Sequence, residues 1–221
     1  MAGPLTGKVA LITGGRKGIG KAVALRLAQD RAAVAINYSF DSKAADEVVQ
    51  QIGDDKAISI QGNAARIPDI ERIVQETVQK FGKIDILMAN AGVLPMRDLM
   101  STSEADFDQT FALNVKGPYF LAQKAVPHMP EGSRIILVST SPCASSTVPP
   151  NSRDLGRRRI LVNALSPGPT GTDLFLKGKS EQVIKALASG NPFNRIAEPE
   201  DQADAAAFLA GEGADGSLDR F

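Results

Sequence analysis

The chain is poor in thiol and imidazole groups, since it contains one cysteine and one histidine, and it has no tryptophan. Because Cys143 has no partner thiol, an internal disulfide and a multi-thiolate metal site are excluded, as is typical of proteins from a reducing compartment. His128 alone cannot build an imidazole-rich metal site, and a single histidine argues against a Ser-His-Asp hydrolase. We therefore expect no metal site.

Neither sign of charge is in excess, since 25 Lys and Arg residues balance 25 Asp and Glu residues. This balance argues against a nucleic-acid partner and against a membrane-surface partner. The apolar run Val9–Ile12 is too short for a signal peptide or a membrane span. The 221 residues, 43% of them hydrophobic, predict one globular domain over residues 1–221, which we expect in the cytoplasm.

Short β-branched runs alternate with stretches of helical spacing, which is typical of parallel βα units. The runs are Val9–Thr13, Ala33–Asn37, Ala57–Gln61, Ile84–Met88, Ile135–Ser139 and Ile160–Leu165. Helical spacing is clearest after Pro68, at Ile70, Ile73, Val74, Thr77 and Phe81. The sequence thus predicts an α/β fold, a single domain with a doubly wound parallel sheet of the Rossmann type and about six strands.

A glycine-rich turn joins the first strand to the first helix. Its sequence is Thr13-Gly14-Gly15-Arg16-Lys17-Gly18-Ile19-Gly20. Glycines permit a tight turn there and let backbone N–H groups approach a phosphate at the helix N-terminus. A turn of this kind between a strand and a helix predicts a dinucleotide site, and a tight βα turn without a ligand is the alternative.

With these residues the chain resembles the classical short-chain dehydrogenase/reductase family, whose fingerprint is T-G-x-x-x-G-x-G. Further family motifs follow in order, namely Asn90-Ala91-Gly92, Asn114 in a helix, Ser139-Thr140-Ser141 and Pro167-Gly168. The resemblance covers roughly residues 5 to 210. It is nearest to fungal reductases of polyketide and naphthol-type carbonyls.

The predicted coenzyme is NADP(H). NAD-preferring sites place an acidic residue about 20 positions after the glycines, where it would repel a 2′-phosphate. Here the second strand ends in Asn37-Tyr38-Ser39, and no acid occurs before Asp41. Arg16 and Lys17 add positive charge to the turn, although both could simply be solvated.

The resemblance also implies the other coenzyme contacts. Asn63 and Ala64 are expected on the adenine side, with Asn90-Ala91-Gly92 beside them, while the loop from Pro167 to Thr172 would hold the nicotinamide amide. The full predicted set is Gly14, Arg16, Lys17, Gly18, Ile19, Gly20, Asn37, Tyr38, Ser39, Asn63, Ala64, Asn90, Ala91, Gly92, Pro167, Gly168, Thr170 and Thr172.

Catalysis in the family is hydride transfer to a carbonyl while a tyrosine, its pKa lowered by a lysine, donates the proton. The resemblance makes Asn114 the residue that holds a relay water, although its spacing from Phe107 and Phe111 also suits an inward-facing core asparagine. Alignment by strands puts Thr140 at the serine position that orients the carbonyl, with Ser139 and Ser141 beside it, and each hydroxyl could instead cap the strand end.

The chain departs from the family at the Tyr-x-x-x-Lys motif. Tyr38 and Tyr119 are its only tyrosines, and Ser42 and Gln123 stand where the lysine would be. The crossover from residue 140 to 159 has 20 residues and room for only a short helix, and no seventh strand is expected near the C-terminus. Three explanations are open: the native polypeptide has residues that this sequence omits, the gene product is truncated, or the protein binds the coenzyme without catalysis.

The predicted function is NADP(H)-dependent hydride transfer involving a ketone, an alcohol or a quinone-like carbonyl of a small molecule. The alternatives are a coenzyme-binding but catalytically silent homologue and a 3-oxoacyl thioester reductase. Residues 173–197 occupy the place of the family's substrate lid, although their apolar spacing equally suits a packed helix pair. A homo-oligomer is possible, and we expect its association to be weakened if the helix after the fifth strand and the C-terminal strand are absent from the native protein.

Overall fold

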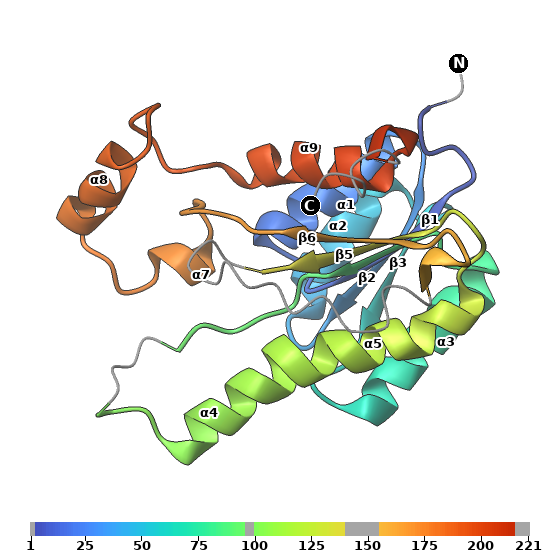
Figure 1. Ribbon diagram of the computed structural model, residues 1–221, viewed down its shortest axis with the longest axis horizontal. Coiled ribbons are helices and arrows are strands. Elements are labelled where there is room, and N and C mark those ends of the chain that lie inside the picture. The colour runs from blue at the N-terminus through green and yellow to red at the C-terminus, as the bar shows by residue number, and fades with distance from the viewer. Residues whose placement is uncertain (1–2, 96–99, 140–154, 215–221) are drawn as a thin grey trace.

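A computed structural model describes residues 3–95, 100–139 and 155–214 of the chain (Figure 1). Six strands form one sheet in the order β3-β2-β1-β4-β5-β6, and every adjacent pair is parallel. The strands are β1 (Val9–Thr13), β2 (Ala33–Tyr38), β3 (Ala57–Gln61), β4 (Ile86–Ala89), β5 (Arg134–Val138) and β6 (Leu161–Leu165). The predicted α/β fold and its six strands are confirmed, with strand bounds shifted by at most two residues.

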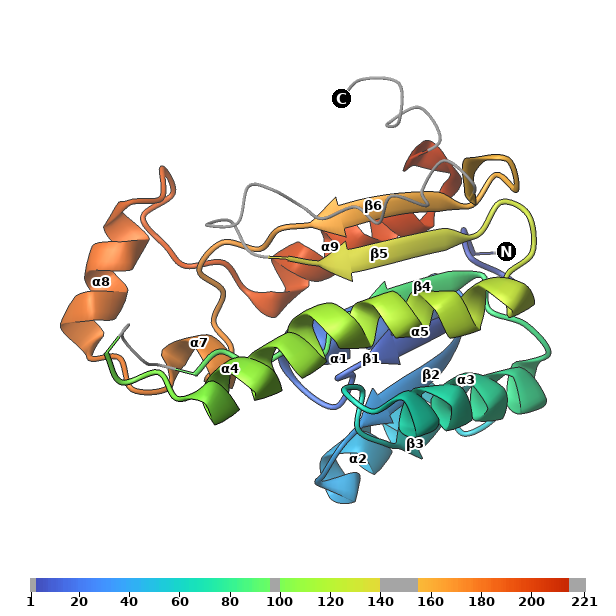
Figure 2. The same ribbon diagram turned by 60° about the horizontal axis from the view of Figure 1, so that its bottom comes forward.

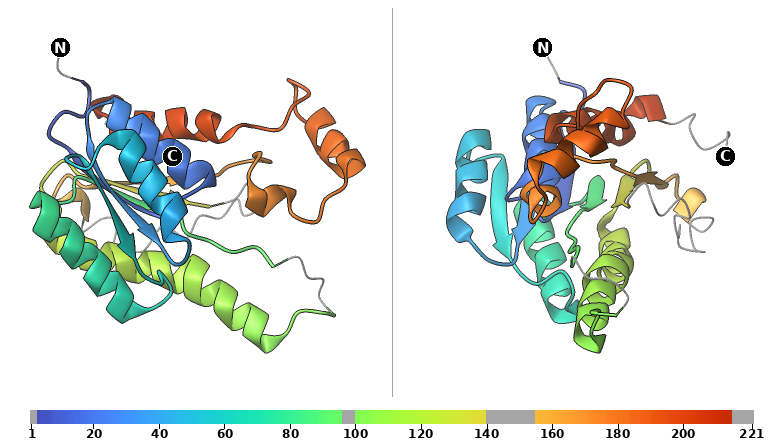
Figure 3. Two further views of the ribbon diagram at one scale, coloured as in Figure 1. Left: turned by 180° about the vertical axis from the view of Figure 1, so that it is seen from behind. Right: turned by 90° about the vertical axis from the view of Figure 1, so that its left-hand side faces the viewer.

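Helices cover both faces of the sheet because its central strands are apolar on both sides. One face packs against α1 (Gly18–Gln29), α2 (Ser42–Ile52) and α9 (Pro199–Ala210), and α9 lies beside α1 (Figure 3). The other face packs against α3 (Ile67–Phe81) and α5 (Gly117–Ala125). Figure 1 shows the two layers above and below the sheet.

Helix α3 follows the spacing read from the sequence. Ile70, Ile73, Val74 and Thr77 are buried, and Pro68 lies in the first turn, where its missing N–H leaves no helical hydrogen bond unmade. The helix ends at Gly82, whose φ of 83° lies in the left-handed region that glycine tolerates best. Helix α3 therefore covers the face of the sheet opposite to the one that α1 covers.

A long helical segment precedes β5. It consists of α4 (Glu104–Phe111), a π-helical turn at Ala112–Lys116 and α5. Phe107, Phe111, Val115 and Tyr119, one turn apart, are all exposed. The expected inward stripe through Phe107 and Phe111 is therefore wrong for the described structure, because none of the described helices and strands covers these side chains.

Two short helices follow β6 and lie beyond the carboxyl ends of the strands (Figure 2). They are α7 (Asp173–Leu176) and α8 (Glu181–Ser189), and neither buries a residue. Val183 is 46% exposed and Leu187 is 38% exposed. A closely packed helix pair would bury these side chains, so the described structure does not fit that interpretation, and the substrate lid over residues 173–197 stays a prediction.

Candidate functional site

The glycine turn at the end of β1 has a backbone that requires glycine. Gly14 has a φ of 67° and Gly18 a φ of 55°, both in the left-handed region. A Cβ on Gly15 would lie 2.6 Å from the Cβ of Ile36, and one on Gly20 would lie 2.5 Å from the carbonyl oxygen of Gly14. The turn therefore packs tightly on β2 and folds back on the start of α1.

The N-terminus of α1 has the form of an anion site. Lys17 is its N-cap residue and makes no capping hydrogen bond through its side chain. The starts of α3 and α5 likewise have no capping side chain, whereas α2, α4, α7 and α8 each begin with a side chain that accepts from a backbone N–H. The first N–H groups of α1 and its dipole are thus directed at the turn, an arrangement that fits the pyrophosphate of a dinucleotide.

Asn90, after β4, holds the turn in place. Its side-chain amide donates to the carbonyl oxygens of Thr13 at 2.9 Å and Gly14 at 3.3 Å. The Thr13 hydroxyl in turn accepts from the backbone N–H groups of Asn90 and Ala91, both at 3.1 Å. The motif Asn90-Ala91-Gly92 therefore clamps β4 to the glycine turn, and Ala91 and Gly92 line the edge beside it.

Both basic residues of the turn form ion pairs with carboxylates. Arg16 donates to Asp41 at 3.2 Å, and Lys17 donates to Asp173 at 3.0 Å. The hydrogen bond from Lys17, with its charge and that of Arg16, lowers the pKa of Asp173. The idea that the two cations are merely solvated is wrong in the described structure. Asp173 could not be predicted as a partner from a local motif because 156 residues separate it from Lys17.

The end of β2 presents less side-chain chemistry than its sequence suggests. Asn37 is 2% exposed, and its amide donates to the carbonyl oxygens of Ile60 and Gly62 at 3.2 and 2.9 Å. Tyr38 is buried in the core under α1 and α2. Ser39, by contrast, is exposed. Within this predicted trio the hydroxyl of Ser39 is the group open to a coenzyme.

Asn63 and Ala64 form the turn after β3. The Asn63 side chain accepts from the N–H of Ala65 at 2.9 Å, while its own N–H donates to Asp69 at 3.0 Å. Ala64 is buried, and its carbonyl oxygen would collide with a Cβ on Gly117. The absence of a side chain on Gly117 therefore lets α5 approach the turn that is predicted on the adenine side.

Asn114 lies in the π-helical turn and is exposed. Its amide oxygen accepts from the N–H of Val93 at 3.0 Å, and its amide nitrogen donates to the carbonyl oxygen of Val93 at 2.8 Å. It is not a buried core residue, and it ties the loop after Asn90-Ala91-Gly92 to the helix. One amide N–H and one oxygen lone pair are left over for a further partner such as water.

The strand ends β5 and β6 bring the remaining predicted residues to the same edge. Ser139 follows β5, and its N–H donates to the carbonyl oxygen of Leu165 at 2.8 Å. Thr140 and Ser141 lie outside the described residues. Because the strands are parallel, their carboxyl ends gather the glycine turn, Ser39, Asn90 and Ser139 along one side of the sheet.

The loop after β6 is held from its far side by residues after α8. Gly171 donates its N–H to the carbonyl oxygen of Ala197, and Ala197 donates to that of Pro169, both at 2.8 Å. The Thr170 hydroxyl donates to the carbonyl oxygen of Gly168 at 2.9 Å, and Thr172 caps α7. A Cβ on Gly18 would lie 3.2 Å from Thr172, so the loop containing Pro167, Gly168, Thr170 and Thr172 meets the glycine turn directly.

Neither tyrosine is placed as a proton donor at this edge. Tyr38 is buried in the core, and Tyr119 packs edge-on against Phe120 with ring centroids 5.3 Å apart. Tyr119 is 43% exposed on α5. Their surroundings agree with the sequence, in which neither tyrosine has a lysine four residues later.

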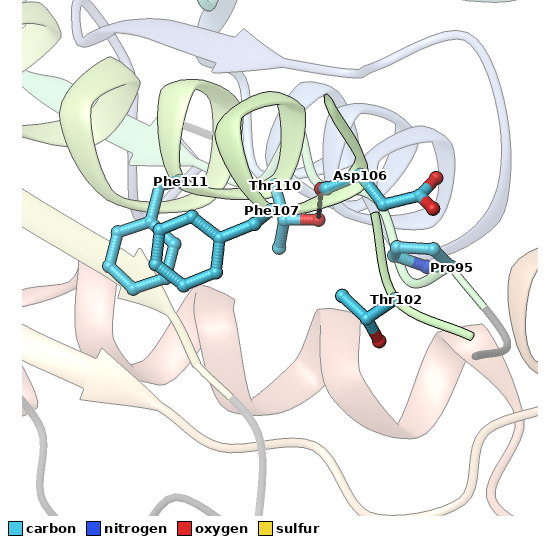
Figure 4. A pocket seen from close by; sticks show the side chains of 6 residues that line it. All are labelled: Pro95, Thr102, Asp106, Phe107, Thr110 and Phe111. Atoms are coloured by element: carbon cyan, nitrogen blue, oxygen red, sulfur yellow. Dashed lines mark hydrogen bonds between the residues drawn. The ribbon is translucent and has the colours of Figure 1, made fainter. Parts of the chain in front are cut away.

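A shallow pocket of about 160 Å³ lies beside the start of α4 (Figure 4). It is lined by Pro95, Thr102, Asp106, Phe107, Thr110 and Phe111. The rings of Phe107 and Phe111 are stacked with centroids 4.3 Å apart. None of its residues belongs to the glycine turn or to the loop after β6, so this pocket is separate from the predicted coenzyme contacts.

Residues 3–95, 100–139 and 155–214 contain neither a membrane span nor a metal cluster. Within these ranges no helix has the length and apolarity that a bilayer crossing requires. The same residues contain no group of three or more His, Cys, Asp or Glu side chains placed to hold a metal ion.

Comparison with known proteins identifies similar sequences and structures. The profile of the short chain dehydrogenase family matches residues 8–151, and that of the enoyl-(acyl carrier protein) reductase family matches residues 144–217. Hydroxynaphthalene reductase arp2 of Aspergillus fumigatus is 38% identical over 239 positions, with 94% of this chain and 87% of that protein covered. Versicolorin reductase 1 of Aspergillus parasiticus is 36% identical over 242 positions, covering 96% and 92%.

Among solved structures, a short chain dehydrogenase from Burkholderia cenocepacia in complex with NADP superposes with a TM-score of 0.89 and 32% identity. The match covers 96% of this chain and 94% of that one. The alignments with the two reductases, 239 and 242 positions, are longer than the 221 residues of this chain. They therefore contain positions at which the relative has a residue and this chain has none.

Proposed function

Since the chain belongs to the short chain dehydrogenase family, a family of oxidoreductases, we propose that it transfers a hydride between NADP(H) and a ketone, an alcohol or a quinone-like carbonyl. The observation that carries this proposal is the glycine turn. Its left-handed glycines, the uncapped N-terminus of α1 and two basic side chains fit the pyrophosphate and the 2′-phosphate of that coenzyme. A similar protein of known structure was solved with NADP.

The residues of the carboxyl edge have distinct roles in this proposal. The turn Gly14–Gly20 binds the pyrophosphate, Asn63 and Ala64 border the adenine, and the loop from Pro167 to Thr172 orients the nicotinamide. When bound, the reduced nicotinamide supplies the hydride. Ser139 stands at the end of β5, where a hydroxyl can orient a carbonyl oxygen, and Thr140 and Ser141 are the alternatives for this role.

Asn114 positions the neighbouring loop and can hold a water molecule. Both ends of its amide bind the backbone of Val93, and the N–H and lone pair that are left over can bind a water of the proton relay. The amide has no proton of suitable acidity to give, so Asn114 is a relay and positioning residue. A proton donor of the Tyr-x-x-x-Lys kind is missing from the sequence.

That gap supports a second candidate function, a coenzyme-binding protein without turnover. The deciding observation is that Tyr38 is buried and that Ser42 and Gln123 replace the expected lysines. An intact mass near 23.3 kDa would establish that the native polypeptide consists of these 221 residues, and a mass several kDa higher would reveal additional residues.

Stopped-flow measurement of hydride transfer tests the proposed function. The protein is mixed with NADPH and a panel of ketones and quinones, and nicotinamide absorbance is followed. Oxidation of NADPH that depends on a carbonyl substrate supports the reductase. Binding of NADPH without oxidation by any substrate supports the silent homologue.

A further inference from the structure

We infer that Asp41 is a specificity-determining residue, which lowers the preference of the site for NADP(H) over NAD(H) by acting as an internal counter-ion of Arg16. This inference rests on the proposed function, since it concerns the same coenzyme site. It starts from the contacts of Arg16 with the segment between β2 and α2.

Arg16 is held on two sides by this segment. Its Nη1 atom lies 3.2 Å from Oδ2 of Asp41, and its guanidinium carbon lies 4.2 Å from the centre of the Phe40 ring. The Arg16 side chain is only 11% exposed, whereas that of Asp41 is 46% exposed. The guanidinium is thus stacked on Phe40 and paired with Asp41, so an anion that binds this guanidinium would compete with a carboxylate.

Asp41 is held by the backbone of α2 as well as by Arg16. Asp41 is the N-cap of α2, its Oδ1 atom accepts from the N–H of Ala44 at 3.3 Å, and its φ of 64° is left-handed. One carboxylate oxygen therefore caps the helix while the other pairs with Arg16. Because the cap anchors it, the carboxylate stays near the guanidinium when the ion pair is exchanged for another anion.

Lys17, the second cation of the turn, does not neutralise the charge of Asp41, because it has a carboxylate partner of its own. Lys17 pairs with Asp173, whose pKa is lowered first by that hydrogen bond and also by the charge of Arg16. The glycine turn thus carries two positive charges that face two negative charges from α2 and α7. The local charge is balanced before any phosphate arrives, so a 2′-phosphate must displace Asp41 from Arg16 and tolerate its charge nearby.

NADH has no 2′-phosphate and meets neither obstacle. The Asp41 carboxylate lies beside the guanidinium that would bind a 2′-phosphate, so its charge should raise the free energy of bound NADPH and leave that of bound NADH almost unchanged. Asp41 therefore reduces the difference between the affinities for NADPH and NADH that Arg16 and Lys17 would otherwise produce. In the sequence, Asp41 can be recognised as the first acidic residue after Asn37-Tyr38-Ser39.

The test is Asp41→Asn, with coenzyme dissociation constants measured by isothermal titration calorimetry. Asparagine tolerates a left-handed φ and caps a helix as well as aspartate, so the fold is preserved while the charge is removed. We expect the dissociation constant of NADPH to fall about tenfold and that of NADH to change less than about twofold. The gain for NADPH should shrink at high salt because the repulsion is screened.

Asp46→Asn is the matched control. Asp46 lies on the same helix and accepts from the Ser59 hydroxyl at 3.0 Å, so its removal changes the net charge equally at a position away from Arg16. Equal gains for NADPH in the two variants, or no gain in Asp41→Asn, would overturn the role of Asp41 while coenzyme binding by the unaltered protein stands. If the unaltered protein binds neither NADPH nor NADH, the proposed function fails, and this inference fails with it.

Discussion

Single side chains of this protein hold the glycine turn in shape, and Asn90 does so most directly. Its amide donates to two carbonyl oxygens of the turn, and its backbone N–H donates to the Thr13 hydroxyl. In Asn90→Ala both carbonyl oxygens lose their donor in a partly buried place. We expect the free energy of unfolding, measured by urea denaturation, to fall by about 1–3 kcal/mol and NADPH binding to weaken.

Asn191→Ala serves as the matched control for that change. The side-chain oxygen of Asn191 accepts one exposed hydrogen bond, from the N–H of Phe193 in the loop after α8, so removal of this side chain should change the free energy of unfolding by less than about 0.5 kcal/mol. Equal losses of stability in the two variants would show that the bonds from Asn90 to the turn carry no special weight.

Sequence motifs at this scale predicted the backbone of the glycine turn, but they did not predict the hydrogen bonds of the Asn37 side chain. Gly14 and Gly18 could be predicted because glycine is the residue type that a left-handed backbone needs. Asn37 was predicted as a coenzyme contact, but its amide is committed to carbonyl oxygens of β3 and the following turn. That commitment depends on strand pairing across 23 residues, which a local motif does not contain.

At the scale of elements, an ion pair fixes the start of α9. Arg195 donates to both carboxylate oxygens of Asp201 at 2.6 and 3.0 Å, and the N–H of Glu198 donates to the same carboxylate at 2.8 Å. The Arg195 hydrogen bonds, followed by that from Glu198, lower the pKa of Asp201 from 3.8 to about 2. The folded state therefore binds this proton less readily than the unfolded state.

This difference makes the contribution of Asp201 depend on pH. The stabilisation is fully present above the unfolded pKa of 3.8 and is lost as the pH falls through about 2. We expect Asp201→Asn to lower the thermal midpoint by a small constant amount near neutral pH, since the pair is exposed. The difference in thermal midpoint between Asp201→Asn and the unaltered protein should narrow below about pH 4. A difference that begins to narrow near pH 6 would contradict the lowered pKa of Asp201.

A second ion pair joins elements on the two sides of the coenzyme site. Lys17 in the glycine turn pairs with Asp173 at the start of α7, and neither α7 nor α8 buries a residue. We expect Asp173→Asn to accelerate amide hydrogen exchange in α7 and α8, with α1 unchanged. Lys17→Met should have the same effect, and the double variant should add nothing, because each change removes the same pair.

The helices and strands themselves were largely predictable, whereas the exposure of one helix face, on α4 and α5, was not. The six strands and α3 follow from apolar runs and helical spacing, which are local properties. The stripe Phe107, Phe111, Val115 and Tyr119 has the same kind of spacing but is exposed. Its burial depends on a packing partner elsewhere in the fold, which the pattern of one helix cannot reveal.

At the scale of the whole molecule, the fold gathers loops from both ends of the sequence at one edge of the sheet. The glycine turn after β1, Asn90 after β4 and the loop after β6 meet there because the six strands are parallel. The order of the motifs predicted this edge. The ion pairs that balance its charge, from α2 and α7, became evident only from the structure.

The edge can hold a coenzyme even though a tyrosine–lysine pair is missing from the sequence. Coenzyme contacts are spread over the carboxyl ends of several strands, whereas proton donation in the family depends on one helix after β5. The alignments with reductases, which are longer than this chain, are consistent with residues missing inside the match. We therefore propose that coenzyme binding and turnover are separable properties of this protein.

Titration of the folded protein with NADPH tests the central claim most directly. Calorimetry and the thermal midpoint are measured in parallel, because a ligand that binds only the native state raises the midpoint, and the rise grows with the logarithm of the free ligand concentration above the dissociation constant. The account predicts saturable binding at one site per chain, a rise in the midpoint, and loss of both effects when Gly18 is replaced by valine. No heat and no shift of the midpoint at about 1 mM NADPH would contradict it.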